Sequence, residues 1–131
     1  MANSMNETLQ SVLLLLVALQ IKHVICDGPL QTLQMVREKS VYGRPQGLFH
    51  GLIHIAGCFV VLSLFGLPLT WAAGLAVLDG TIHYHIDFIK ENVVKRMGWS
   101  YSDSQFWWAI ITDQTLHHMT SVVLVWLALK P

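Results

Sequence analysis

Charged side chains are scarce in this sequence. Of its 131 residues only 12% are Asp, Glu, Lys or Arg, whereas roughly 25% are charged in soluble domains. Basic and acidic residues are equal in number, and no basic stretch with interleaved aromatic residues is present. These shortages exclude an electrostatic nucleic-acid surface, so we expect no nucleic-acid partner. With 53% hydrophobic residues, the composition predicts an integral membrane protein whose first partner is the lipid bilayer.

Cysteine and proline are also rare. The two cysteines, Cys26 and Cys58, are far apart and lie in apolar segments. We therefore expect small buried side chains rather than a disulfide or a thiolate ligand. Pro29, Pro45 and Pro68 fall between apolar segments, because proline interrupts the helical hydrogen-bond pattern. A chain of this length has room for one domain, and we expect a single integral membrane domain.

Four apolar segments lie between these breaks, at about residues 7–27, 46–67, 69–88 and 105–129. Each has close to the ~20 residues with which a helix crosses ~30 Å of hydrocarbon. Residues 30–40 carry apolar side chains at helical spacing beside charged ones, which is typical of an interfacial helix. The expected fold is all-α: a four-transmembrane-helix bundle with a short interfacial helix between helices one and two.

Basic residues are concentrated in two of the three linkers. Linkers one and three carry Arg37, Lys39, Arg44, Lys90, Lys95 and Arg96. The turn between the second and third segments has no charge. Because positive charge is retained on the cytoplasmic side, we expect linkers one and three in the cytoplasm and both termini outside.

Histidine is abundant, with seven in the chain. Each predicted helix carries a pair of His or Asp residues four positions apart, which places both side chains on one face. The four pairs are His23 and Asp27, His50 and His54, His83 and Asp87, and Asp113 and His117. In the predicted topology all four pairs fall in the cytoplasmic half of the membrane. Ionisable groups are costly there and usually functional.

Imidazole and carboxylate groups are ligands of divalent transition metals. We interpret the four pairs as metal ligands and expect a divalent ion, Zn in the first place and Mn or Fe as alternatives. The pairs supply more donors than one tetrahedral ion needs. Either a second ion lies nearby, or the surplus residues orient the ligands through hydrogen bonds. A carboxylate not bound to metal, Asp79 or Asp113, is expected to act as general base.

Polar residues flank the four pairs. They are Gln31, Lys39, Lys90 and Gln114, and we expect them to bind an anionic substrate such as a phosphate. For the lysines, the alternative is that the ammonium groups reach to the lipid headgroups. His85 and His118 point away from the ligand faces, and we expect them at an interface or a loop.

The motifs resemble those of a bacterial family of small inner-membrane proteins, the domain-of-unknown-function 3307 family. The matching residues are His23-x3-Asp27-x3-Gln31, Lys39, His50-x3-His54, His83-x3-Asp87 with Lys90, and Asp113-Gln114-x2-His117. The resemblance covers about residues 13–127 and implies a multi-pass protein of the bacterial inner membrane. More distantly, the chain is similar to inner-membrane metal-dependent hydrolases. One departure is Gly28-Pro29, where the family pattern has an aromatic and an aliphatic residue, so the placement of Gln31 stays open.

Four functions agree with these features. The first is a membrane-embedded metal-dependent hydrolase acting on a lipid or lipid-linked phosphate or ester, with the metal lowering the pKa of a bound water. The second is a non-catalytic metal or proton handler, such as a transporter, sensor or subunit. A homo-oligomer of the chain is also compatible with this function. The third is a haem-binding bundle. The fourth is a structural bundle whose polar residues only join helices.

Overall fold

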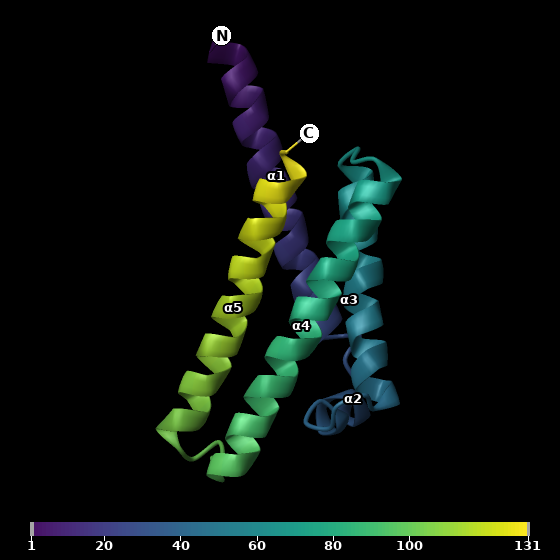
Figure 1. Cartoon of the computed structure of the whole chain (residues 1–131). Helices are drawn as coiled ribbons and strands as arrows, with labels where there is room; N and C mark the ends of the chain where they lie inside the picture. The colour runs from purple at the N-terminus through teal and green to yellow at the C-terminus, as the bar shows by residue number, and fades with distance from the viewer. Residues whose placement is uncertain (1, 131) are drawn as a thin grey trace.

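The computed structural model describes residues 2–130, and within them it contains five helices and no strand. The helices are α1 (Ala2–Asp27), α2 (Leu33–Glu38), α3 (Pro45–Leu64), α4 (Leu69–Met97) and α5 (Ser104–Ala128). The four long helices lie side by side, and α2 lies at the end away from the chain termini (Figure 1). Both α1 and α4 pack against α3 and α5, so the four helices close a ring. The prediction of an all-α fold is confirmed.

Local signals at the helix ends match most of the predicted boundaries. Helix α1 ends before Gly28 and Pro29, as expected, although it begins at Ala2 rather than at residue 7. Helix α2 is shorter than the predicted interfacial segment. It begins after Thr32, whose hydroxyl accepts a hydrogen bond from the backbone N–H of Met35 at 3.2 Å, a standard N-terminal cap. Helix α3 has Pro45 in its first turn, where the missing N–H costs nothing.

The largest difference concerns α4. The sequence predicted a span ending at residue 88 and a polar linker from residue 90, but the helix continues to Met97. No Gly or Pro occurs between Phe88 and Gly98, and polar residues such as Lys, Glu and Arg are good helix formers. Gly98 then adopts the left-handed conformation (φ 67°), and the N–H of Trp99 donates to the carbonyl of Val94 at 3.1 Å. This is a Schellman-type end.

The interior has an apolar half and a polar half. The apolar half, nearer the chain termini, consists of Leu15, Leu19, Cys58, Leu62, Ala72, Leu75, Ala76, Leu124 and Val125. Both cysteines are buried free thiols, as predicted. The polar half holds buried His and Asp side chains from all four long helices. The same four helices therefore enclose two chemically different interiors.

Helices α3 and α4 approach closely at a glycine. A Cβ atom on Gly80 would lie 2.8 Å from the carbonyl oxygen of Gly51 and 2.3 Å from Cγ1 of Ile55. Because the first contact is with backbone, it cannot be relieved by a rotamer change. The absence of a side chain at Gly80 therefore sets the distance between the two helices that carry His50, His54, His83 and Asp87.

Two helices of the described residues are long and apolar enough to cross a membrane, Met5–Asp27 and Pro45–Leu64. Helices α4 and α5 do not reach the same apolarity, so the four-span prediction is supported for two helices only. The reason lies in their buried polar residues. Asp79, His83 and Asp87 of α4, and Asp113 and His117 of α5, lower the mean hydropathy although they face the interior.

Candidate metal centre

Asp27, at the end of α1, lies at the centre of the polar half. Its Oδ1 is 3.1 Å from Nε2 of His50, 3.0 Å from Nε2 of His54 and 3.4 Å from Nε2 of His83. Its Oδ2 is 3.2 Å from Nε2 of His23, one turn earlier on α1. Side chains from α1, α3 and α4 thus direct four ring nitrogens at one carboxylate.

A second carboxylate, that of Asp87, continues the cluster toward α5. Its Oδ2 is 3.2 Å from Nε2 of His83 and 3.5 Å from Nε2 of His50, and its Oδ1 is 3.7 Å from Nε2 of His117. His117 is in turn 3.6 Å from Oδ1 of Asp113, one turn earlier on α5. The two oxygens of Asp87 therefore face different histidines.

The cluster divides into three groups, and within each group the potential ligand atoms lie within 4.8 Å of one another. They are His23, Asp27, His54 and His83; His50, His83 and Asp87; and Asp87, Asp113 and His117. We call these the first, second and third groups. The first two share His83 and the last two share Asp87, so the groups form one continuous row. All eight residues of the four sequence pairs belong to it.

The spacing of these atoms suits a divalent cation. Ligands of a tetrahedral ion at about 2.0–2.1 Å are about 3.3 Å apart, and the distances from Asp27 to its histidines run from 3.0 to 3.4 Å. Nε2 of His50 is also only 3.0 Å from Nε2 of His83. Without a metal, two such nitrogens can form one hydrogen bond through a single shared proton. A cation between them would accept the lone pairs of both nitrogens.

Unpartnered polar atoms point the same way. Among the described residues, Nε2 of His117 and Oδ1 of Asp113 are buried without a hydrogen-bond partner. Leaving such groups unpaired costs about 1–3 kcal/mol each. Buried His and Asp groups of this kind can hold a metal ion, and the donor set fits one.

A lysine from the first linker enters the cluster. Lys39, just after α2, is buried, and its Nζ lies 2.7 Å from Oδ2 of Asp87. Lys39 also donates to the side-chain oxygen of Gln31, whose amide nitrogen donates to the carbonyl of Asp27 at 3.0 Å. Gln31 thus lies beyond the end of α1, as the Gly28-Pro29 break suggested, yet it still contacts the cluster through backbone and Lys39.

Linker one is held against α4 by hydrogen bonds of its own. The backbone N–H of Gly43 donates to the Tyr84 hydroxyl at 2.7 Å, and the Asn92 side chain donates to the carbonyl of Ser40 at 3.0 Å. Asn92 belongs to the extension of α4 that the sequence did not predict. That extension therefore helps to place Lys39 beside Asp87.

The remaining flanking residues lie on the α4–α5 side. Gln114 donates to Oδ2 of Asp113 at 3.1 Å, and its side-chain oxygen is 3.2 Å from Nε2 of His23. Lys90 forms an ion pair with Glu91 at 2.5 Å. Burial acts to lower the pKa of Lys90, but the hydrogen bond and the charge of Glu91 outweigh it, and the pKa is raised. Lys90 is therefore a cation at neutral pH.

Asp79 lies outside the three groups. Its Oδ2 is 2.5 Å from Nζ of Lys22, and both side chains are buried. This pair was not predicted from the sequence. A lysine within an apolar segment is itself a signal, because a buried ammonium needs a partner of opposite charge. His85 and His118 are also outside the groups, and they hydrogen-bond to Tyr42 and Gln20.

Comparison with known proteins places the chain in a family. No curated protein and no solved structure matches it, and the predicted distant relation to metal-dependent hydrolases stays a prediction. One family model, described as a protein of unknown function (DUF3307), matches residues 15–130, nearly the whole chain. The chain therefore belongs to the DUF3307 family.

Proposed function

We propose that the protein is a multi-pass inner-membrane protein that binds divalent cations in the His/Asp cluster and hydrolyses a lipid or lipid-linked phosphate or ester. The observation that carries the proposal is the row of three groups, in which four helices direct eight His and Asp side chains at one another. Separate helix-joining contacts do not require such convergence. A bound metal ion would explain why the side chains converge.

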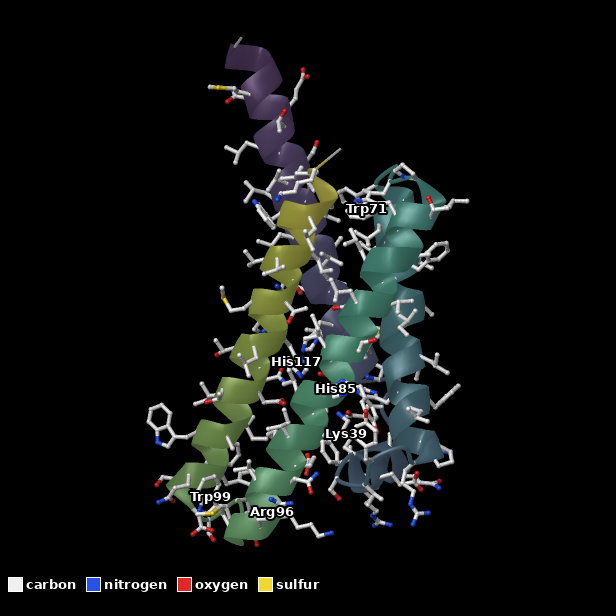
Figure 2. The ribbon with its side chains drawn as sticks, in the orientation of Figure 1. Lys39, Trp71, His85, Arg96, Trp99 and His117 are labelled. Atoms are coloured by element: carbon white, nitrogen blue, oxygen red, sulfur yellow. The ribbon has the colours of Figure 1, made fainter. Side chains whose placement is uncertain are left out.

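The outer surface supports four membrane crossings. Large apolar side chains are exposed on α4 and α5 as well as on α1 and α3; on α4 and α5 they include Leu69, Val77, Leu78, Trp107, Ile111, Val122, Val123 and Trp126. Trp71 lies near the end that holds the chain termini, and Arg96 and Trp99 lie at the opposite end (Figure 2). This distribution agrees with aromatic belts and with a cytoplasmic position of linkers one and three.

Two ions fit the ligand row better than one. Each imidazole presents Nε2 to the cluster and binds one ion, so His83 can complete either the first group or the second. Asp87 can serve two positions, because its two oxygens face different histidines. We assign the first group to one ion and two members of the third group, Asp87 and His117, to another, with His50 between them and Asp113 left without a bound ion. Nitrogen and oxygen donors of this kind suit Zn, with Mn and Fe as alternatives.

When bound, the ions would polarise a phosphoryl or acyl oxygen and lower the pKa of water. In hydrolysis, water adds to the phosphorus or carbonyl carbon, the bond to the leaving oxygen breaks, and that oxygen takes a proton. We assign the proton transfer to Asp113, whose Oδ1 has no hydrogen-bond partner among the described residues. Asp79 is the weaker choice, because Lys22 pairs with its carboxylate. Lys39 would hold an anionic oxygen of the substrate.

Two alternatives are disfavoured by specific contacts. Haem needs a planar slot beside its axial histidine, but the rings of His54 and His83 stack on each other with centroids 3.4 Å apart. A transport path needs polar residues in both halves of the interior, but the half near the termini is apolar. A metal sensor or subunit would use the same centre without turnover, and an assay of hydrolysis on a lipid panel distinguishes it from the hydrolase.

The test is elemental analysis of protein purified in detergent. We expect bound Zn, Mn or Fe in the wild type, and His54→Leu and His83→Leu to lose it. His85→Leu is the matched control, because His85 lies outside the groups, and it should keep the metal. Wild-type metal content should accompany hydrolysis of at least one phosphate or ester in a lipid panel. Equal metal content in all four proteins would refute the centre, and full metal with no turnover would leave a non-catalytic binder.

A further inference from the structure

The strongest unexplained feature is a groove on the outer side of α4 and α5. It has a volume of about 380 Å³ and is lined mainly by apolar side chains, among them Ile86, Ile89, Val93, Trp108 and Leu116. This volume is at the lower end of the range for small-molecule sites. Lys90 and Trp99 also line the groove, and Trp99 lies at the end of the molecule opposite the chain termini (Figure 2).

One residue belongs to both the groove and the ligand row. Asp113 lines the groove and is also a member of the third group. The residue is 4% exposed, and its Oδ1 has no hydrogen-bond partner among the described residues. A molecule in the groove would therefore have its polar end beside Asp113 and Lys90 and its apolar part along α4 and α5.

The net charge of the ligand row determines which charge the polar end of a molecule in the groove must carry. The row holds the carboxylates of Asp27, Asp87 and Asp113, and among the described residues only that of Asp87 forms an ion pair with a lysine, Lys39. Without metal the row is therefore negative and repels anions. Two divalent ions add four positive charges and reverse the sign. The loaded centre attracts an anion, and the metal-free centre does not.

We propose that the α4–α5 groove holds the acyl chain of a single-chain amphiphile with a phosphate headgroup, which enters sideways from the bilayer and places its phosphate at the metal centre. This inference rests on the proposed function and deepens it by naming the substrate class and its route. A single chain matches the modest volume and apolar lining of the groove. Lys90, which also lines the groove, would contact the phosphate.

The test is photolabelling in detergent with a long-chain alkyl phosphate that carries a diazirine in its chain. We expect label on α4 and α5 residues of the groove when the protein is metal-loaded. Ala109→Trp, which fills the groove, should lower labelling about tenfold. Leu52→Trp is the control, because it fills a different groove of 380 Å³ between α3 and α4, and labelling should be unchanged. Thr112→Trp, at an exposed groove position, replaces Ala109→Trp if that variant does not fold.

Three further arms separate the sources of binding. Removal of metal should lower labelling by the alkyl phosphate about tenfold but not labelling by the alcohol of equal chain length. Inorganic phosphate should compete only at much higher concentration than the alkyl phosphate. Equal competition would show that the site takes free phosphate and would overturn the amphiphile.

Metal content is measured on each sample. Metal-loaded protein labelled equally in the Ala109→Trp and Leu52→Trp variants would overturn the groove assignment alone and leave the metal centre standing. Wild-type protein without metal would overturn the proposed function itself.

Discussion

The apolar and polar halves of the interior join the same four helices by different means. In the apolar half, side chains such as Leu19, Leu62 and Leu124 fill the space between helices. In the polar half, His and Asp side chains from the same helices approach within 3.0–3.7 Å but leave some atoms unpartnered. In the proposed membrane environment lipid is as apolar as leucine, so packing in the first half would gain mainly dispersion contacts. In the second half, the proposed cation would supply the missing partners.

The buried ion pair marks the boundary between these regions. Lys22 of α1 meets Asp79 of α4 one turn from His83 toward the apolar half. The Lys22 side chain also packs closely against Gly57 of α3, because a Cβ atom at Gly57 would lie 2.9 Å from Cγ of Lys22. The two halves are thus separated by one neutral pair, and substitutions on either side test whether they act independently.

The largest effect is expected from Asp27→Ala. The substitution removes the carboxylate that faces four histidines, and metal affinity should fall by more than about 100-fold, the upper range for losing an outer-shell partner. Competition with a chelator of known affinity measures it. Asp103→Ala is the control, because within residues 2–130 the Asp103 side chain accepts hydrogen bonds from Ser100 and lies outside the three groups. Retention of metal by Asp27→Ala would show that the Asp27 carboxylate does not hold a cation in the polar half.

Lys22→Met should destabilise the boundary next most strongly. The buried Asp79 carboxylate would lose its partner, which costs about 3–5 kcal/mol. Thermal unfolding in detergent measures the loss, and the double variant Lys22→Met/Asp79→Leu should recover most of it. Lys95→Met, at an exposed position of α4, is the control. No recovery in the double variant would mean that Lys22 acts through other contacts.

Leu62→Ala tests the apolar half. Buried Leu→Ala substitutions usually cost 2–5 kcal/mol, but in lipid the transfer contribution is largely missing, so we expect roughly 1–3 kcal/mol. Metal content per folded molecule should stay at the wild-type level. Leu64→Ala, on the exposed surface of α3, serves as the reference. A loss of metal in Leu62→Ala would show that packing in one half sets ligand geometry in the other.

Metal removal should change the free energy of unfolding by an amount similar to that of Leu62→Ala. A ligand present at 100 times its Kd stabilises the folded state by about 2.7 kcal/mol. Dialysis against chelator should lower the unfolding temperature of the wild type accordingly, and adding Zn should restore it. Asp27→Ala should show no such shift. A chelator effect equal in both proteins would place the stabilising ion elsewhere.

The sequence was sufficient to predict the four long helices and to bring the eight candidate ligand residues into one region. Spacing of four residues fixes the face of a helix, and proline and glycine fix its ends. The ligand pairs therefore converge wherever the helices pack. Helix α4 was predicted too short because polarity was read as the end of the helix, whereas only Gly98 ends it.

Partners that come from different helices could not be predicted. The pairing of Lys22 with Asp79, and of Lys39 with Asp87, depends on the rotation of α1 and on hydrogen bonds that hold linker one to α4. Neither follows from spacing within one helix. Asp79 was accordingly predicted as a general base, although its carboxylate is paired with Lys22.

The sharing of His83 and Asp87 between neighbouring groups has a consequence for loading. An ion that takes His83 into the first group leaves the second group incomplete, and an ion that takes both oxygens of Asp87 weakens the third. The positions therefore cannot fill as independent equivalents. A metal titration should show two unequal steps, with the first ion deciding where the second can go.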